Sequence, residues 1–469
     1  MFKATIVGGG IGGLTLAIMF EAAGIDYTIL ERSSVLKTLG SMIALNASAL
    51  RLMDQLGLWK DIKRISKPIG GFNLQDEDLC PIGSIDFTFG EKHYGYHGCV
   101  MARSALFELL KSRVPKSKVL LNKRVVSMEE TDQGVLCQCA DETSYWSDIL
   151  VGADGAYSTT RNWLYKRLEQ LDQLPAQDRE PLRLSHLCVM GVSSALDPFK
   201  FPVLRNEFTR FELMLFKKSR YSIWLTPIAD NKISWCYGGE MDEKTSSSLE
   251  QGHWERCTAT TRVILDAVRN VKTSFGCTVD EIISTTPKEL VSSVMLEEKY
   301  FSTWHGKRVV LLGDACHKVL PFAGQGAVHA MLDGLCLTNL LHGMTSTSTD
   351  DFERVFQEYY RQRSSSAKKA ILGSRLFGYF VDSKGFMARL IRKIALSILP
   401  QRVTTALADR VMRDRPQLQF LPQVEDRGSA KAWGSPRAPM SFTRPLSFVS
   451  SFVLCCVVIK LRSEMSSAW

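Results

Sequence analysis

Residues 6–17, IVGGGIGGLTLA, decide how the chain begins to fold. The apolar residues 3–7 predict a short buried strand, and the apolar residues after the glycines predict a helix. Gly8 permits a tight turn, Gly10 lets the main chain approach a ligand closely, and Gly13 lets the helix pack against the strand. The stretch therefore predicts a strand–turn–helix unit whose helix N-terminus can bind a phosphate group.

A second apolar run, residues 26–30, ends at Glu31, 23 residues after Gly8. A carboxylate at this place can accept hydrogen bonds from ribose hydroxyls, and it would repel a 2′-phosphate. We therefore expect a dinucleotide site that prefers NAD or FAD to NADP. The alternative is a glycine-rich turn that binds nothing.

Two later motifs each follow an apolar strand. Residues 148–161 run into Asp154-Gly155, and residues 308–327 contain Gly313-Asp314 followed by P-x-x-G-Q-G. An aspartate after a strand can accept a hydrogen bond from a ligand hydroxyl, but aspartate and glycine are also ordinary turn formers. A role at a ligand is favoured because both motifs follow the dinucleotide fingerprint in one chain.

In this combination the sequence resembles the single-component flavin-dependent monooxygenases of the aromatic-hydroxylase type, over about residues 1–345. The resemblance implies FAD as the cofactor, with Asp314 at the ribityl chain and Asp154 near both FAD and the reductant. The N–H groups of Gly326 and Ala327, at a helix N-terminus, would stabilise negative charge on the flavin. No second G-x-G-x-x-G occurs, which implies that NADPH is a transient reductant.

Two further residues are assigned by resemblance. Arg103 begins a predicted helix where relatives hold an arginine against the FAD pyrophosphate, and Ala44 lies in a loop that contacts FAD through small residues. The alternatives are a surface arginine near a helix cap and a plain buried loop. His329 stands where many relatives have asparagine, and we expect it to be a packing residue.

The predicted fold class is α/β: a Rossmann-like FAD-binding domain, an inserted antiparallel sheet that forms the substrate domain, and a helical C-terminal region. The FAD-binding domain is discontinuous, from residues 1–175 and 290–345, and the substrate domain is residues 176–289. Residues 346–439 form the helical region and a linker, and residues 440–469 form a membrane-associated tail.

Composition and charge narrow the range of functions. The chain has 469 residues with 45% hydrophobic and 23% charged residues, typical of a globular protein. From residue 361 onward, 19 Lys/Arg stand against 6 Asp/Glu, whereas the rest has 39 against 43. An acidic body with a basic end is not typical of a nucleic-acid binder. The 12 cysteines show no metal-binding spacing, so we expect no metal, and the lack of a signal peptide predicts an intracellular protein.

The most apolar run of the C-terminal region is residues 447–459. The 15 uncharged residues between Arg444 and Lys460 would span roughly 22 Å as a helix, less than the hydrocarbon core of a bilayer. We expect membrane association through a short anchor or an interfacial helix. The alternative is a late strand or a docked helix.

Among the monooxygenases, the sequence looks most like the fungal epoxidases of meroterpenoid and indole-diterpene pathways. This resemblance implies a reaction in which NADPH and O2 epoxidise the terminal olefin of a hydrophobic, prenylated substrate. Two alternatives stay open: salicylate-type ring hydroxylation, and a non-redox escort protein that binds prenylated partners, like the guanine-nucleotide dissociation inhibitors. An escort protein would be expected to have lost the flavin motifs, which are intact here.

Tyr221 is the candidate catalytic residue. It lies on a predicted strand of the sheet that covers the flavin, where the fungal relatives use a tyrosine or an arginine. The arginine position falls near residues 186–188, which contain none. A phenol at residue 221 can donate a hydrogen bond to the oxygen atom being transferred. The alternative is a tyrosine that packs on the sheet.

Overall fold

The computed structural model describes residues 2–36, 41–217, 219, 221–240, 265–382 and 411–432, with residues 390, 392, 395–396, 405 and 408–409 between the last two ranges. The predicted membrane tail, residues 440–469, lies outside the described residues.

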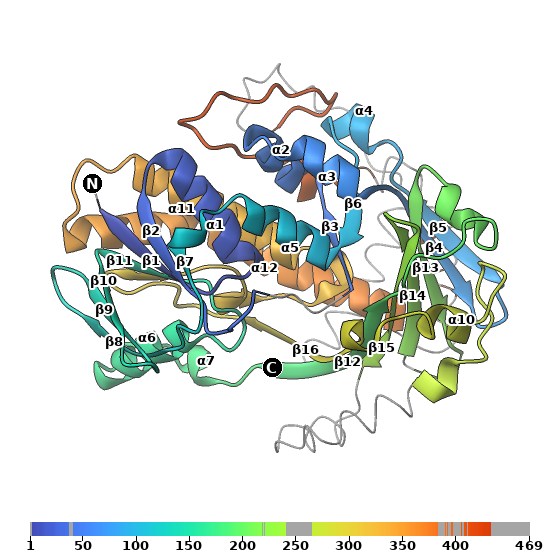
Figure 1. Cartoon of the computed structure of the whole chain (residues 1–469), viewed down its shortest axis with the longest axis horizontal. Helices are drawn as coiled ribbons and strands as arrows, with labels where there is room; N and C mark the ends of the chain where they lie inside the picture. The colour runs from blue at the N-terminus through green and yellow to red at the C-terminus, as the bar shows by residue number, and fades with distance from the viewer. Residues whose placement is uncertain are drawn as a thin grey trace.

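A five-stranded parallel sheet forms one side of the molecule (Figure 1). Its order is β17 (Val309–Leu311), β11 (Ile149–Gly152), β1 (Lys3–Val7), β2 (Asp26–Leu30) and β7 (Val119–Leu120). Most of its side chains are buried, because both faces of the sheet are covered.

Helices cover one face of this sheet and a small sheet covers the other. On one face, Ala4, Ile6 and Val151 pack with α1 (Ile11–Ala23), α5 (Arg103–Ser112) and α11 (Gly326–His342). On the other face, Val7 and Leu150 pack on the three-stranded sheet of β8 (Val125–Glu130), β9 (Val135–Cys139) and β10 (Ser144–Ser147), beside which lies α6 (Thr159–Gln170). The alternation of side chains along each strand separates these two cores.

A ten-stranded sheet forms the other side of the molecule (Figure 1). Its order is β18 (His317–Lys318), β16 (Ser292–Tyr300), β12 (Arg183–Val192), β15 (Lys232–Glu240), β14 (Tyr221–Ile228), β13 (Thr209–Leu215), β4 (Lys67–Asp76), β6 (Cys99–Ala102) and β3 (Met42–Leu45), and β5 (Pro81–Asp86) pairs with β4. Neighbours from β16 to β13 are antiparallel, but β13 runs parallel to β4. Residues 42–102 and 292–300, which the sequence places in the FAD-binding domain, therefore supply strands to the large sheet.

The two faces of the large sheet have different surroundings. The inner face, defined by Met190, Leu213 and Trp224, lies toward the loop at Ser41 and toward α12 (Thr349–Asp382). The outer face, defined by Val189, Met214, Ile223 and Leu225, packs on residues 196–204 and on α10 (Val279–Ile283). The inner face is thus the one presented to the rest of the molecule.

The remaining elements link these layers. They are α2 (Ala47–Gln55), α3 (Trp59–Ile65), α4 (Gly90–Tyr94) and α7 (Ala176–Arg179), with 3-10 turns η1 (Lys116–Lys118), η2 (Pro202–Arg205), η3 (Lys288–Leu290), η4 (Gly313–Ala315) and η5 (Pro321–Ala323). The 34-residue α12 lies in the range for which the sequence predicts helices. Residues 411–432 return along α2, where Arg51 donates to the main-chain oxygens of Arg415 and Val424. None of the described helices combines the length and the apolar character needed to cross a bilayer.

Candidate active site

Four sequence motifs meet at the carboxyl edge of the parallel sheet. Gly8 follows β1, Glu31 follows β2, Asp154 follows β11, and Asp314 follows β17. Because these four strands are adjacent and parallel, their ends share one edge, where open α/β sheets bind their ligands. The fold therefore assembles a single site from residues up to 306 positions apart in the chain.

The glycine-rich turn has the geometry of a dinucleotide cradle. Gly8 has a φ of +105°, and a Cβ there would lie 2.5 Å from the Ala153 carbonyl oxygen. A Cβ on Gly13 would strike the Gly8 carbonyl oxygen, whereas a Cβ on Gly10 would meet no atom within 4 Å. Gly8 and Gly13 are thus required for packing, and Gly10 leaves its main chain open to a pyrophosphate.

Glu31 orders this turn as well as facing the site. Its Oε2 accepts from the main-chain N–H of Gly9 at 2.8 Å, and its Oε1 accepts from that of Ser33 at 2.9 Å. The carboxylate therefore holds the loop after β1 against the loop after β2. A ribose bound between them would meet a carboxylate that is already fixed in place.

The Asp154 side chain bonds to the first turn of α6, whose N-cap residue is Ser158. It accepts from the Ser158 hydroxyl at 2.5 Å and from the Thr160 main-chain N–H at 3.0 Å, at the start of α6. Arg161, buried in α6, donates to the carbonyl oxygens of Ala315 at 3.0 Å and Ala156 at 2.7 Å. Arg161 thus links the Asp154 loop to the Gly313-Asp314 turn. Arg161 is part of the sequence motif, but the motif does not indicate this contact.

The Asp314 side chain lies beside the N-terminus of α11. A Cβ on Gly326 would lie 4.0 Å from Asp314 Oδ1, and Asp314 Oδ2 pairs with Lys318 Nζ at 2.5 Å. No side chain caps α11, so the N–H groups of Gly326 and Ala327 are available at the end of a 17-residue helix. A carboxylate acceptor and free N–H donors at one place suit the hydroxyls and the acceptor atoms of a flavin nucleotide.

Ala44 faces the turn that precedes α11. Gly324 has a φ of +61°, and a Cβ there would lie 3.6 Å from the Ala44 Cβ. β3, which carries Ala44, and the P-x-x-G-Q-G turn therefore approach each other closely. The structure thus brings Ala44 together with the other predicted flavin contacts.

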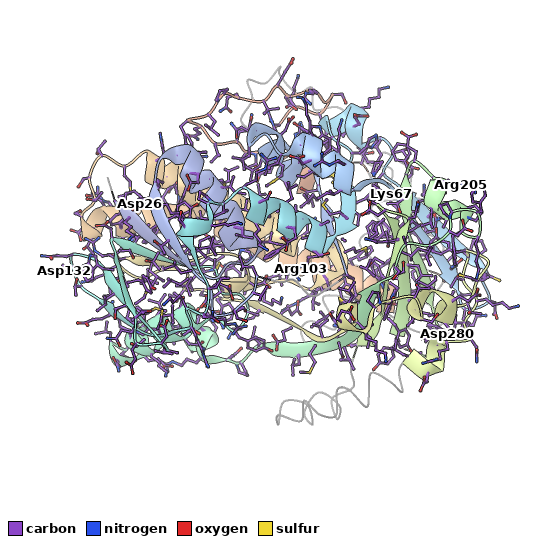
Figure 2. All side chains as sticks on the ribbon, viewed as in Figure 1. Asp26, Lys67, Arg103, Asp132, Arg205 and Asp280 are labelled. Carbon is purple, nitrogen blue, oxygen red and sulfur yellow. The ribbon has the colours of Figure 1, made fainter. Side chains whose placement is uncertain are left out.

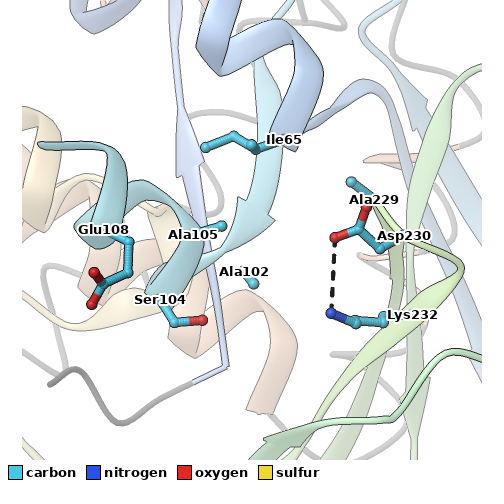
Figure 3. A pocket seen from close by; sticks show the side chains of 8 residues that line it. All are labelled: Ile65, Ala102, Ser104, Ala105, Glu108, Ala229, Asp230 and Lys232. Atoms are coloured by element: carbon cyan, nitrogen blue, oxygen red, sulfur yellow. Dashed lines mark ion pairs between the residues drawn. The ribbon is translucent and has the colours of Figure 1, made fainter. Parts of the chain in front are cut away.

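Arg103 lies at the margin of this group. It is exposed at the start of α5, and Figure 2 shows it between the parallel sheet and the large sheet. Beside it, a small open pocket separates α5 from the β14–β15 turn, with Ser104 and Glu108 on one wall and the pair Asp230–Lys232 (3.8 Å) on the other (Figure 3). Arg103 is free to reach an anion, but the contact with the pyrophosphate stays a prediction.

The inner face of the large sheet presents a neutral row toward the site. Met190, Cys236 and Trp224 are direct neighbours across three strands, and each is partly exposed. Phe322, from the turn before α11, lies 6.2 Å from the Trp224 ring, and Phe377 of α12 lies 6.3 Å from it. We call Met190, Cys236, Trp224, Phe322 and Phe377 the apolar wall.

Tyr221 does not belong to the apolar wall. It is three residues before Trp224 on β14, so the two side chains point to opposite faces. The Tyr221 ring stacks on Tyr237 at 5.3 Å and packs with the outer-face core. The catalytic role expected for Tyr221 is therefore not supported by its position, which is that of a packing residue.

Comparisons with known proteins agree with this site. A family model described as "FAD binding domain" matches residues 1–373. The FAD-dependent monooxygenase janM of Penicillium janthinellum is 29% identical over 91% of this chain and 87% of its own length. The FAD-dependent monooxygenase paxM of Penicillium paxilli is 28% identical over 91% of this chain and 88% of its own length.

Solved structures share the fold. Klebsiella pneumoniae HpxO, in complex with FAD and uric acid, has a TM-score of 0.71 at 19% identity and matches 87% of this chain and 96% of its own. A salicylate hydroxylase substrate complex has a TM-score of 0.65 at 18% identity, over 88% of this chain and 98% of its own. The fungal relatives confirm the resemblance read from the motifs and decide for a flavoenzyme over a non-redox escort protein. The chain belongs to the FAD-binding-domain family and is an FAD-dependent monooxygenase.

Proposed function

We propose that this enzyme epoxidises the terminal olefin of a prenylated intermediate in fungal terpenoid (meroterpenoid) biosynthesis, with NADPH as reductant. In the balanced reaction, NADPH, a proton, O2 and the olefin give NADP⁺, water and the epoxide. Bound FAD supplies the redox chemistry by accepting electrons from the reductant and activating O2. The protein must hold the flavin, place the olefin and exclude water.

The apolar wall is the observation that carries the proposal. None of Met190, Cys236, Trp224, Phe322 and Phe377 is charged, and the Trp224 indole N–H is already bonded to the Ser222 hydroxyl at 3.0 Å. Such a surface binds a substrate through buried apolar area and complementary shape, and an isoprenoid chain offers only these interactions. A carboxylate-bearing substrate such as salicylate would lose hydration against it without a charged partner.

A panel of substrates tests the proposal. The holoenzyme is supplied with NADPH and O2, and with either a prenylated indole, the same indole with a saturated prenyl chain, or salicylate. NADPH oxidation and hydrogen peroxide release are measured together. The olefin should be oxygenated with little peroxide, and the saturated analogue should bind but release peroxide. Coupled conversion of salicylate to a hydroxylated product would contradict the proposal.

Membrane association is also part of the proposal, for an enzyme that works inside the cell. An isoprenoid substrate partitions into bilayers, and residues 361–469 carry a net charge of +13, from 19 Lys/Arg against 6 Asp/Glu. Sedimentation of the full chain with anionic vesicles, compared with a chain that ends at residue 439, tests whether the tail binds lipid. Equal sedimentation of the two chains would contradict a role for the tail.

A further inference from the structure

A buried ionic network lies directly beneath the Gly313-Asp314 turn. At its centre is Asp333 of α11, which is fully buried. Its carboxylate accepts from the Gly313 main-chain N–H at 3.1 Å, from His317 Nε2 at 2.5 Å and from Arg363 Nε at 2.8 Å. One carboxylate thus binds the strand-end turn, the chain just after it and helix α12.

Arg363 provides the second half of the network. Its side chain is 6% exposed, and its Nη2 also donates to His329 Nδ1 at 3.1 Å. His329 must therefore accept at Nδ1, which requires the neutral ring. Burial, followed by the charge of Arg363, lowers the pKa of His329 to about 3, in agreement with this hydrogen bond. His329 is thus a partner of Arg363.

Cys316, His317 and Asp333 could together offer metal ligands, since their ligand atoms lie within 4.8 Å of one another. The same carboxylate, however, already carries the Arg363 guanidinium at 2.8 Å, and Cys316 Sγ donates to the Gly313 carbonyl oxygen at 3.4 Å. Burial raises the pKa of the Cys316 thiol, which disfavours the thiolate that a metal requires. The carboxylate and the thiol are thus already bonded to protein groups.

This network fixes the Gly313-Asp314 turn, which lies close against α11. Gly313 has a φ of +61°, and a Cβ there would lie 2.9 Å from the Ala330 Cβ, so the turn is pressed against α11. The bond from the Gly313 N–H to Asp333 holds the turn from below while Asp314, the next residue, faces the flavin site. A shift of Asp333 would therefore move Asp314 and the adjacent N-terminus of α11.

We propose that Asp333 and Arg363 are positioning residues for FAD. Arg363 neutralises and orients the Asp333 carboxylate, and Asp333 aims Asp314 at the ribityl chain. This inference rests on FAD binding and not on the proposed substrate, so a failure of one leaves the other standing. It also assigns a role in cofactor binding to α12, which carries no residue of the nucleotide fingerprint.

The test compares two buried arginines, each of which pairs with an aspartate. Arg363→Met keeps the length of the side chain and removes its charge, and Arg415→Met does the same at a matched site. Arg415 is 2% exposed and pairs with Asp426 at 2.9 Å in the C-terminal segment along α2. For each variant, FAD is titrated into apoprotein, the flavin absorbance spectrum is recorded, and thermal unfolding is measured without FAD.

Both Met variants should unfold at a lower temperature, because each leaves a carboxylate, fully buried at Asp333 and partly buried at Asp426, without its arginine. Only Arg363→Met should also weaken FAD, by roughly 10-fold or more, and shift the spectrum of the bound flavin. In the double variant with Asp314→Ala, the two losses of FAD affinity should not add, since one acts through the other.

Three results would overturn the proposal: unchanged FAD affinity in Arg363→Met, an equal loss in Arg415→Met, or additive losses in the double variant. If Arg363→Met does not fold, Arg363→Lys decides. Lysine keeps the charge at Asp333 but cannot reproduce both guanidinium bonds, so FAD affinity should fall by a smaller factor. Full retention of affinity and spectrum in the folded Lys variant would show that charge alone suffices and would contradict the orienting role.

Discussion

Replacing Glu31 by alanine should weaken FAD binding through the order of the glycine-rich turn. The variant removes two acceptors, one for the partly buried Gly9 N–H at 2.8 Å and one for the exposed Ser33 N–H at 2.9 Å. A hydrogen bond to a charged group contributes about 1.5–3 kcal/mol, and water replaces much of the exposed one. In the variant, FAD binding must restore the order that the carboxylate no longer gives, so a loss of about 1.5–3 kcal/mol raises Kd by up to roughly 10- to 150-fold. A lost contact with the ribose would add to this value.

The assay is a titration of FAD into apoprotein, followed by quenching of flavin fluorescence. Asp76→Ala is the matched control, because Asp76 accepts from the main-chain N–H groups of Asp78 and Cys80, both at 3.0 Å, in a hairpin of the large sheet. The control should bind FAD like the wild type. A Kd for Glu31→Ala within threefold of wild type would refute the argument, since the turn would then keep its shape without the carboxylate.

Other predictions follow from the same geometry. Purified Asp314→Ala should contain less FAD than purified Arg103→Ala, because in Arg103→Ala the free N–H groups of α11 and α1 still bind the phosphates. A lower FAD content in Arg103→Ala would contradict the assignment of the site. Trp224→Ala should raise KM for a prenylated substrate about tenfold or more, with the FAD content unchanged. Tyr221→Phe should change turnover and coupling by less than about threefold. A large loss of coupling in Tyr221→Phe would restore it as a catalytic residue. His329 stays neutral in the folded protein down to about pH 3, whereas in the unfolded chain it takes up a proton near pH 6.5. Between these two pH values the unfolded state therefore binds more protons than the folded state. The free energy of unfolding should accordingly fall as the pH falls from 6.5 toward 3. In thermal melts His329→Asn should reduce this slope, and an unchanged slope would show that other groups cause it.

The sequence predicts the cofactor site well because its signals are local. Gly8 and Gly13 each have a separate steric requirement, Gly10 leaves the main chain open, and the turn residues Asp154 and Asp314 each follow an apolar strand. Once the strands are parallel neighbours, these residues must meet at one edge. The contacts with FAD themselves stay predictions.

The large sheet is harder to predict, because its pairings are distant in the chain. β13 pairs in parallel with β4, with Leu213 opposite Leu74. No sequence pattern in either strand identifies the other as its partner. For the same reason the sequence assigns residues 42–102 wholly to the FAD-binding domain. Alternation does predict that Tyr221 and Trp224 face opposite ways, but not which of the two faces the flavin.

The network around Asp333 also could not be predicted from the sequence. Arg363 stands 30 residues from Asp333 in a helix rich in arginine and lysine, and only the packing of α12 on α11 selects it. His329 is expected to be a packing residue and is buried, but its acceptor role depends on that same arginine. A charged residue with a fully buried side chain is recognisable only once the fold is known.

Isotope labelling of the product shows directly where the enzyme places the oxygen atom and where that atom comes from. The holoenzyme is supplied with NADPH, 18O2 and a prenylated indole, and the product is analysed by mass spectrometry. We predict a product that is one 18O atom heavier than the substrate, with the oxygen in an epoxide at the terminal olefin and the ring unchanged. An 18O label on the aromatic ring, or an oxygen that derives from H2 18O in the reciprocal experiment, would contradict this prediction.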